Sequence, residues 1–328
     1  MAGLDPAIQT AMSRVGALPA TEAASARRRW WGGELTAGRL AFVMNLPSLL
    51  IFATVLLFPL CYAAYLSVSR VRIGELRRGF PFPFHGLENY TRLFEDGLFL
   101  LSLQNTFVFT IIVVTVEVIL GLAIALLINQ QGIVLSRVTR FLILLPYAIP
   151  PIANGLIWVY IYNFKLGFLN RVLFQLGLIE QNIDWTGVPE TALYSLTVPY
   201  IWRTLPFAIL LFHAALQGLP QELFEAAKVD GANAWYRFWH ITLPLMRPII
   251  AVVVILRTSF AFLVFDEVLA ITQGGPGDAT WVASWFSYKK SFAPPFNIGM
   301  GAASAYVLAV LIAVLAILYI RFLYKRTD

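Results

Sequence analysis

The chain has 328 residues, of which 59% are hydrophobic and 13% are charged, and its formal net charge is +6. Soluble domains carry roughly 25% charged residues, so this composition excludes an ordinary soluble domain and indicates an integral membrane protein. In such a protein, an excess of lysine and arginine is typical of cytoplasmic loops and gives no indication of nucleic-acid binding. The single cysteine excludes an intrachain disulfide and a cysteine-built metal site, and the three histidines show no ligand spacing, so we expect no metal.

The N-terminal segment, residues 1–38, is rich in alanine, arginine and glycine and lacks a sustained apolar period. We expect a mostly disordered cytoplasmic arm whose end, "ARRRWWGG" at 26–33, is suited to a membrane surface. The apolar run that follows covers about 41–67. It is far longer than the hydrophobic region of a cleaved secretory signal, which has about 7–15 residues, so we interpret it as the first membrane span.

Five more apolar runs are long enough to cross about 30 Å of hydrocarbon. They cover about 102–128, 141–163, 193–217, 248–270 and 300–323. The predicted fold is therefore an all-α integral membrane domain, residues 39–328, with six transmembrane helices and both termini on the same side of the membrane.

The distribution of lysine and arginine predicts the orientation of these spans. Of the 24 basic residues, Arg203 and Arg257 lie within spans; with the N-terminus inside, thirteen of the others fall in cytoplasmic segments and nine in outer ones. Basic residues in the first outer loop weaken this difference, but the same loop also holds four acids. We therefore expect both termini, and the segment between the fourth and fifth spans, to lie in the cytoplasm.

That segment contains the most polar long stretch in the second half of the chain, "EAAKVDGANAWYRFWHITLPLMRP" at 225–248. Pro220 and Glu222 suit the start of a helix, and Gly231 suits the left-handed position at a helix end. Two prolines near the end are expected to stop a second, aromatic-rich helical run. Two interpretations remain open: a helix that lies flat on the bilayer, or a docking element for a soluble partner.

The same stretch resembles the signature loop of permease subunits of binding-protein-dependent ABC importers. That signature has Glu-Ala-Ala, then Asp-Gly-Ala, then an aliphatic residue with proline, and a final proline. The matching residues are Glu225, Ala226, Ala227, Asp230, Gly231, Ala232, Leu243, Pro244 and Pro248. The resemblance implies a coupling helix that sits in a cleft of an ATP-hydrolysing subunit, where Glu225 makes polar contacts and Gly231 permits the turn.

The resemblance covers most of residues 40–325 and leaves the N-terminal arm aside. The stretches at 86–94, 140–163, 201–220 and 257–280 are similar to the carbohydrate-uptake branch, in particular to the first permease of maltose, glycerol-phosphate and lactose type systems. This implies a multi-pass subunit of a bacterial inner membrane that moves a carbohydrate or related polyol inward by alternating access. Its implied partners are a second, similar permease, two ATPase subunits that hold ATP and Mg, and an extracytoplasmic solute-binding protein.

Motifs for catalysis are missing from the sequence. There is no G-x-x-x-x-G-K-S/T phosphate loop and no recognisable nucleophile motif, so we expect a transport subunit without enzymatic activity and without a cofactor of its own. Three alternatives remain: an importer of an anionic sugar derivative such as a phosphorylated polyol, a stand-alone secondary transporter, and a membrane-embedded enzyme.

Ionisable side chains inside spans are costly and mark paired or functional positions. Five stand out, and they are Glu117, Arg203, Arg257, Asp266 and Glu267. With a helix rise of about 1.5 Å per residue, Glu117 and Arg257 fall at similar depth near the middle, and Arg203 falls near Asp266 and Glu267 toward the outer face. These groups either join helices or line the substrate path and bind sugar hydroxyls, and an unpaired Arg203 would favour an anionic sugar.

The third span contains three prolines and Gly155, which predict a break or kink of the kind found at binding regions in transporters. Next to this break we expect Asn154 to face the substrate path, together with aromatic rings that would cover sugar C–H groups. The candidate rings are those of Trp158, Tyr160, Tyr162, Trp202, Phe207, Phe262 and Phe265. Their alternative roles are packing and anchoring at the membrane interface. In the outer loops, "TQGGPGDAT" at 272–280 and Lys289 with Lys290 are expected to face the solute-binding protein.

Overall fold

The computed structural model describes residues 37–130 and 133–323 of the chain. The predicted N-terminal arm lies outside the described residues, except for its last two, where the first helix begins. The chain forms two compact units, Met1–Cys61 and Tyr62–Asp328, and each is described by itself.

The first unit contains α3 (Ala37–Ile51), the π-helical turn η1 (Phe52–Leu57) and the first turn of α4 (Phe58–Ser67). The helix that they build covers Ala41–Ser67, 27 residues, and is apolar enough to cross a membrane. It agrees with the first predicted span.

The second unit is made of helices and connecting loops. Their bounds are α5 (Ile73–Arg78), α6 (Glu88–Glu95), α7 (Gly97–Asn129), α8 (Ile133–Leu144), η2 (Pro146–Ala148), α9 (Pro151–Ile161), α10 (Phe168–Gln175), α11 (Pro189–Gln217), α12 (Gln221–Val229), α13 (Ala234–Arg237), η3 (Phe238–Thr242), α14 (Leu243–Phe262), η4 (Val268–Thr272), α15 (Ala283–Phe292) and α16 (Ile298–Leu323). In the part of the chain that the structure describes, extended pairing is confined to two isolated bridges, so the fold is all-α as predicted.

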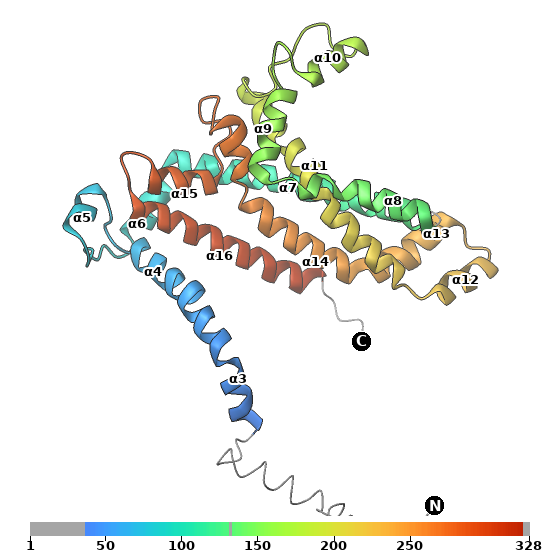
Figure 1. Cartoon of the computed structure of the whole chain (residues 1–328), viewed down its shortest axis with the longest axis horizontal. Coiled ribbons are helices and arrows are strands. Elements are labelled where there is room, and N and C mark those ends of the chain that lie inside the picture. Colours follow the sequence, from blue (N-terminus) through green and yellow to red (C-terminus); the bar gives the residue numbers. More distant parts are fainter. Residues whose placement is uncertain (1–36, 131–132, 324–328) are drawn as a thin grey trace, which may run out of the picture. The chain divides into compact units, whose positions relative to one another are not determined.

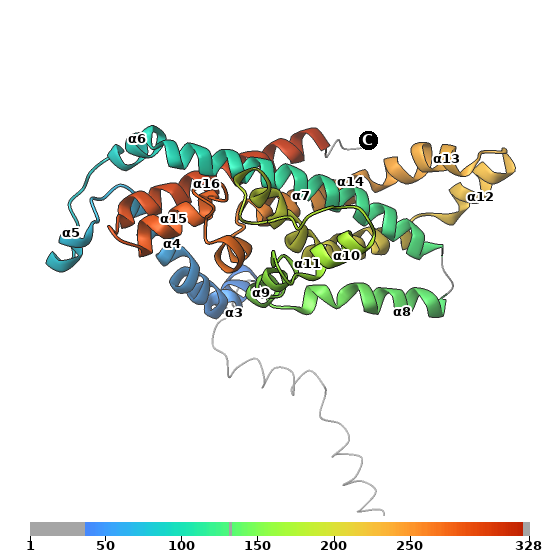
Figure 2. The same ribbon diagram turned by 90° about the horizontal axis from the view of Figure 1, so that it is seen from above.

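The long helices α7, α11, α14 and α16 lie side by side and form the body of this unit (Figure 1; Figure 2). Helices α12 and α13 lie beyond one end of the body, and α6 and α15 lie at the opposite end. Helices α7 and α11 approach closely at Gly121, where an added Cβ would lie 3.2 Å from the Cβ of Ala208. Small residues at such a crossing let two membrane helices pack backbone to backbone.

Among the residues that the structure describes, five helices are long and apolar enough to span a membrane, and there are six if one bent pair counts as a single span. The bent pair joins Phe141–Ala148 to Pro151–Ile161 at an angle of 97°. The third predicted span is therefore broken at Pro150 and Pro151, because proline removes a backbone donor and its ring clashes with the preceding turn. This confirms the predicted kink.

The fifth predicted span, 248–270, differs from the observed helix. The apolar helical run that contains it covers Ala234–Phe262, so it begins earlier and ends earlier. Pro244 and Pro248 do not stop the helix, and that expectation was wrong. The π-helical turn η3 comes directly before α14, so the regular i→i−4 hydrogen-bond ladder is already interrupted next to Pro244 and the missing N–H of this proline costs little.

Candidate functional site

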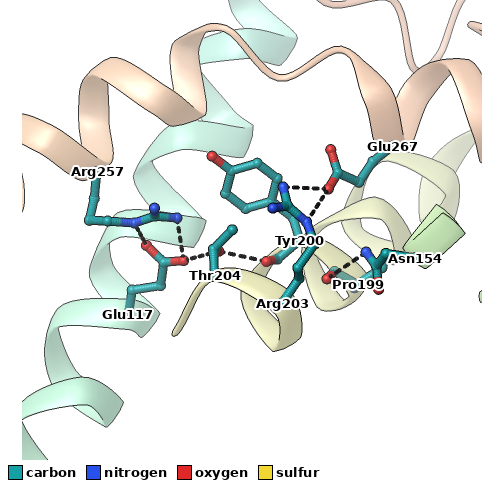
Figure 3. A network of polar contacts seen from close by, with 8 residues as sticks. All are labelled: Glu117, Asn154, Pro199, Tyr200, Arg203, Thr204, Arg257 and Glu267. Carbon is teal, nitrogen blue, oxygen red and sulfur yellow. Dashed lines mark hydrogen bonds and ion pairs between the residues drawn. The ribbon is translucent and has the colours of Figure 1, made fainter. Parts of the chain in front are cut away.

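A buried ion pair joins α7 to α14 in the middle of the helix body (Figure 3). The guanidinium of Arg257 donates from Nε to Oε2 of Glu117 at 2.5 Å and from Nη2 to Oε1 at 2.7 Å. Thr204 on α11 donates its hydroxyl to the same carboxylate at 2.5 Å. The exposed fractions of the Arg257 and Glu117 side chains are 4% and 0%, so the predicted pair is present and ties three helices together.

A second ion pair lies at the next level, where Arg203 on α11 meets Glu267. The Arg203 Nη2 lies 3.2 Å from the Glu267 Oε1, and the glutamate side chain is 2% exposed. This confirms the pairing of Arg203 and decides between its two predicted partners. The neighbouring carboxylate of Asp266 has no hydrogen bond or ion pair within the described residues.

The ring of Tyr200 lies between the two arginines (Figure 3). Its centroid is 5.8 Å from the Cζ of Arg203 and 5.7 Å from the Cζ of Arg257, which is within the range of a cation–π interaction. Tyr200 was not among the sequence candidates. The available signal was its position on α11, three residues before Arg203 and four before Thr204, which places all three side chains on one helical face.

These groups surround a cavity of 340 Å³. Its lining residues are Tyr147, Tyr200, Arg203, Thr204, Phe207, Arg257, Phe260, Leu263, Val264, Phe265, Asp266 and Glu267. Four charged sequence candidates, Arg203, Arg257, Asp266 and Glu267, therefore meet at one site, which we name the polar cavity. Glu117 does not line the cavity, but its ion pair with Arg257 holds that arginine in the cavity wall.

The other path candidates lie elsewhere. The Asn154 side chain is fully buried, and its amide donates to the carbonyl of Pro199 at 3.2 Å, so it holds α9 against α11. Phe262 is buried in an apolar cluster. Trp158 and Tyr162 line a second, largely aromatic cavity of 440 Å³ beside the N-terminal half of α11.

Trp202, the last of these candidates, is 39% exposed, and its ring contacts the ring of Trp158 at a centroid distance of 6.1 Å. The structure therefore places the candidate rings of Phe207 and Phe265 in the polar cavity, but not those of Trp158, Tyr162, Trp202 and Phe262. The bend at α9 turns its side chains away from it, which could not be read from helical spacing.

The segment that carries the signature motif forms a helix, a tight turn and a second helix. At the end of α12 the N–H of Ala232 donates to the carbonyl of Ala227 at 2.8 Å, and the N–H of Gly231 donates to the carbonyl of Lys228 at 3.1 Å. Gly231 has a φ of 76°, so this is the Schellman ending that favours glycine. The guanidinium of Arg237 donates to the Ala232 carbonyl at 2.5 Å and fixes the turn.

Helix α12 presents one face to the body and one to the outside. Phe224 lines a cavity of 380 Å³ together with side chains of α7 and α11, and it is partly buried. Glu225 and Ala226 are exposed, and so is Asp230. Within the described residues no hydrogen bond or ion pair holds the Glu225 carboxylate, which leaves it available to another molecule.

Apolar spans around a polar cavity, with an exposed and tightly turned helix beyond their ends, define a membrane transport subunit. The chain belongs to the family of binding-protein-dependent transport system inner membrane components, whose family model matches residues 117–327.

Similar proteins agree with this assignment. The chain is 35% identical to the trehalose/maltose transport system permease protein MalF of Thermococcus litoralis, over 88% of this chain and 95% of that one. It is 34% identical to the sulfoquinovosyl glycerol transport system permease protein SmoG of Agrobacterium fabrum, over 86% and 89% of the two chains. A solved bacterial ABC transporter involved in the import of alginate has the same fold, with a TM-score of 0.75, 21% identity and coverage of 88% and 96%.

Membership of this family establishes the general role. The chain is a multi-pass inner-membrane permease component of an ABC importer, and ATP hydrolysis belongs to a separate subunit. The resemblance to this family is therefore confirmed, and the interpretations as a stand-alone secondary transporter and as a membrane-embedded enzyme are excluded.

Proposed function

We propose that this permease carries a neutral carbohydrate or polyol inward, by alternating access through the polar cavity. The observation that carries the proposal is the pairing of charges in that cavity. Both arginines are bound by glutamates, whereas the carboxylate of Asp266 lines the cavity without a partner among the described residues.

This arrangement favours a neutral substrate over an anionic one. An anion would need a guanidinium that is free to bind it, and in the cavity Arg203 already binds Glu267. A free carboxylate at Asp266 adds repulsion for an anion, whereas it can accept hydrogen bonds from sugar hydroxyls. Of the two relatives described above, one is named for neutral disaccharides and the other for a sulfonated glycoside. The charges in the cavity support the first class for this chain.

The cavity also offers what a sugar needs to bind. Tyr147, Phe207 and Phe265 contribute aromatic rings to its wall, and ring faces cover the apolar C–H surfaces of a pyranose. The buried glutamates hold the arginines in place, so the guanidinium N–H groups face the cavity in fixed directions. The volume of 340 Å³ lies within the range of small-molecule sites, roughly 300–1,000 Å³.

The assembly that we propose follows from the signature segment. Helix α12 would lie in the cytoplasm, as would both termini, and would dock into an ATPase subunit through Glu225, Ala226 and Asp230. A second, similar permease, two ATPase subunits with ATP and Mg, and an extracytoplasmic solute-binding protein would complete the importer. Closure of the ATPase pair would move α12 and open the cavity to alternate sides. The rigid Schellman turn at Gly231 supports transmission of this motion.

Substrate charge is tested by uptake into cells that express the whole importer. Trehalose and maltose serve as neutral probes, and sulfoquinovosyl glycerol serves as an anionic probe. We expect uptake of a neutral probe and at least a tenfold loss in Asp266→Asn, since a bond to an ionised acceptor contributes about 1.5–3 kcal/mol. Glu180→Gln is the control, because Glu180 is exposed in the loop between α10 and α11, to which no role is assigned. Uptake of the anionic probe alone, or full activity of Asp266→Asn, would overturn the proposal.

Docking is tested with two glutamates on one helix. Glu222 and Glu225 are both exposed on α12, and only Glu225 belongs to the signature. We expect Glu225→Ala to weaken co-purification of the ATPase by about 30-fold, the loss typical of an interface hot spot of 2 kcal/mol, and Glu222→Ala to change it little. Equal effects of the two variants, with the permease inserted normally, would contradict the assignment of Glu225.

A further inference from the structure

Helix α15 carries three aromatic side chains that the transport cycle described above does not use. Trp285, Tyr288 and Phe292 follow one another at intervals of three and four residues, so they share one side of the helix. Their exposed fractions rise along the helix, 3% for Trp285, 38% for Tyr288 and 69% for Phe292. These three side chains therefore lead from the interior to the surface.

The inner rings of α15 contact Phe265, which lines the polar cavity. The ring centroid of Phe265 lies 5.7 Å from that of Trp285 and 5.1 Å from that of Tyr288. The Tyr288 centroid lies 5.6 Å from that of Phe292. Phe265, Tyr288 and Phe292 thus form a continuous series of rings, which we name the aromatic row, from the cavity wall to an exposed position.

The backbone around the aromatic row is fixed. The hydroxyl of Ser284 donates to the carbonyl of Val264, directly before Phe265. The N–H of Ala283 donates to the hydroxyl of Thr106 on α7 at 2.9 Å. These bonds hold the start of α15 against α7 and against the segment that carries Phe265, so the spacing of the rings is set by the fold.

The surroundings of the aromatic row indicate a polar ligand instead of lipid. Its inner end opens on a cavity lined by Arg203 and Asp266, and hydrocarbon chains avoid such groups. The ammonium of Lys289 lies 5.6 Å from the centroid of the Trp285 ring, which itself contacts the rings of Phe265 and Tyr288. A ligand that covers these ring faces must keep its other groups beside charges and water. Such a ligand has one apolar side and one hydroxylated side.

We propose that the aromatic row is the entrance along which a glycan of two or more sugar rings passes into the polar cavity. This inference rests on the proposed carbohydrate transport. The C–H faces of successive pyranose rings would stack on Phe292, Tyr288 and Phe265, and their hydroxyls would stay in water or reach Lys289. Stacking of this kind tolerates different sugars, which suits an entrance and leaves selection to the cavity.

The test uses the complete importer with its solute-binding protein, and trehalose, maltose and maltotriose as probes. For a probe that the unmodified importer takes up, we expect the double variant Tyr288→Ala/Phe292→Ala to raise the sugar concentration for half-maximal uptake about fivefold. Tyr288→Phe, which keeps the ring, should stay within twofold. Phe174→Ala removes a ring that is 58% exposed on α10 and should have no effect. The maximal rate and the thermal stability should be unchanged in all of these variants.

Three results would overturn the inference. The first is an unchanged half-maximal concentration in the double variant. The second is an equal loss in Tyr288→Phe, which would assign the effect to the hydroxyl. The third is a double variant that needs more solute-binding protein to stimulate the ATPase, by the same factor with and without sugar. That result would identify a protein-docking surface. If the unmodified importer takes up none of the probes, the proposed function fails and this inference fails with it.

Discussion

Replacing Glu117 by alanine would leave the guanidinium of Arg257 buried without a counter-charge. The pair is nearly inaccessible to solvent, with exposed fractions of 0% and 4%, and the same carboxylate accepts a third bond from Thr204. Removal of one partner from such a pair costs about 3–5 kcal/mol, because the remaining charge must stay buried or force the structure open. With roughly 2 °C per kcal/mol for a chain of this size, the unfolding midpoint should fall by about 6–10 °C.

Thermal unfolding of the purified importer in detergent, followed by tryptophan fluorescence, measures this loss. The control is Glu88→Ala, which breaks a pair with Arg92 whose side chains are 48% and 44% exposed. An exposed pair contributes less than about 1 kcal/mol, so the control should fall by no more than about 2 °C. The double variant Glu117→Leu/Arg257→Met, which removes both charges, should recover at least half of the loss. Equal shifts in Glu117→Ala and Glu88→Ala, or no recovery in the double variant, would refute the reasoning.

Three further predictions concern backbone geometry and loop attachment. Gly231→Val should lower the stability of the turn by about 1–2 kcal/mol and weaken ATPase binding, because φ is 76° at this position, whereas Gly231→Asn should be tolerated. Co-purification with the ATPase measures both variants, and equal binding by the two would contradict the role of the turn. Gly155→Ala should destabilise the importer, since its Cβ would lie 2.5 Å from the Cβ of Ala270, and Ala270→Gly added to it should restore the unfolding midpoint; failure of that rescue would exclude this contact as the cause. Asn105→Leu should loosen the loop before α15, because the amide of Asn105 donates to the carbonyls of Ala279 and Trp281 at 3.1 and 2.9 Å. We expect faster proteolysis of that loop, and an unchanged rate of cleavage would contradict the prediction.

The spans and the ion pairs could be predicted from the sequence because each rests on a simple physical quantity. Hydrocarbon thickness sets the length of an apolar run, and helix rise sets the depth of a charge within it. On that basis Glu117 was matched with Arg257 and Arg203 with the acids at 266 and 267, and both pairs are present.

The end of α14 and the direction of the aromatic rings could not be predicted in the same way. Residues 263–270 are as apolar as the helix before them, so composition did not reveal that the helix ends at Phe262. Trp158 and Tyr162 were expected in the substrate path, but the 97° bend before α9 directs them to a different cavity. Tyr200 was missed because an aromatic residue in a span usually packs against neighbours, and only the two arginines around it reveal its position.

The central claim is that the polar cavity opens to alternate sides of the membrane. Since Cys61 is the only cysteine, Cys61→Ser gives a background in which Phe260→Cys places one thiol in the cavity wall. The measurement is labelling of that thiol by a membrane-impermeant reagent, in vesicles of either orientation that hold the complete importer. We predict labelling from the cytoplasmic side without ATP and from the outer side when ATP is trapped. Labelling from the same side in both states would contradict the account.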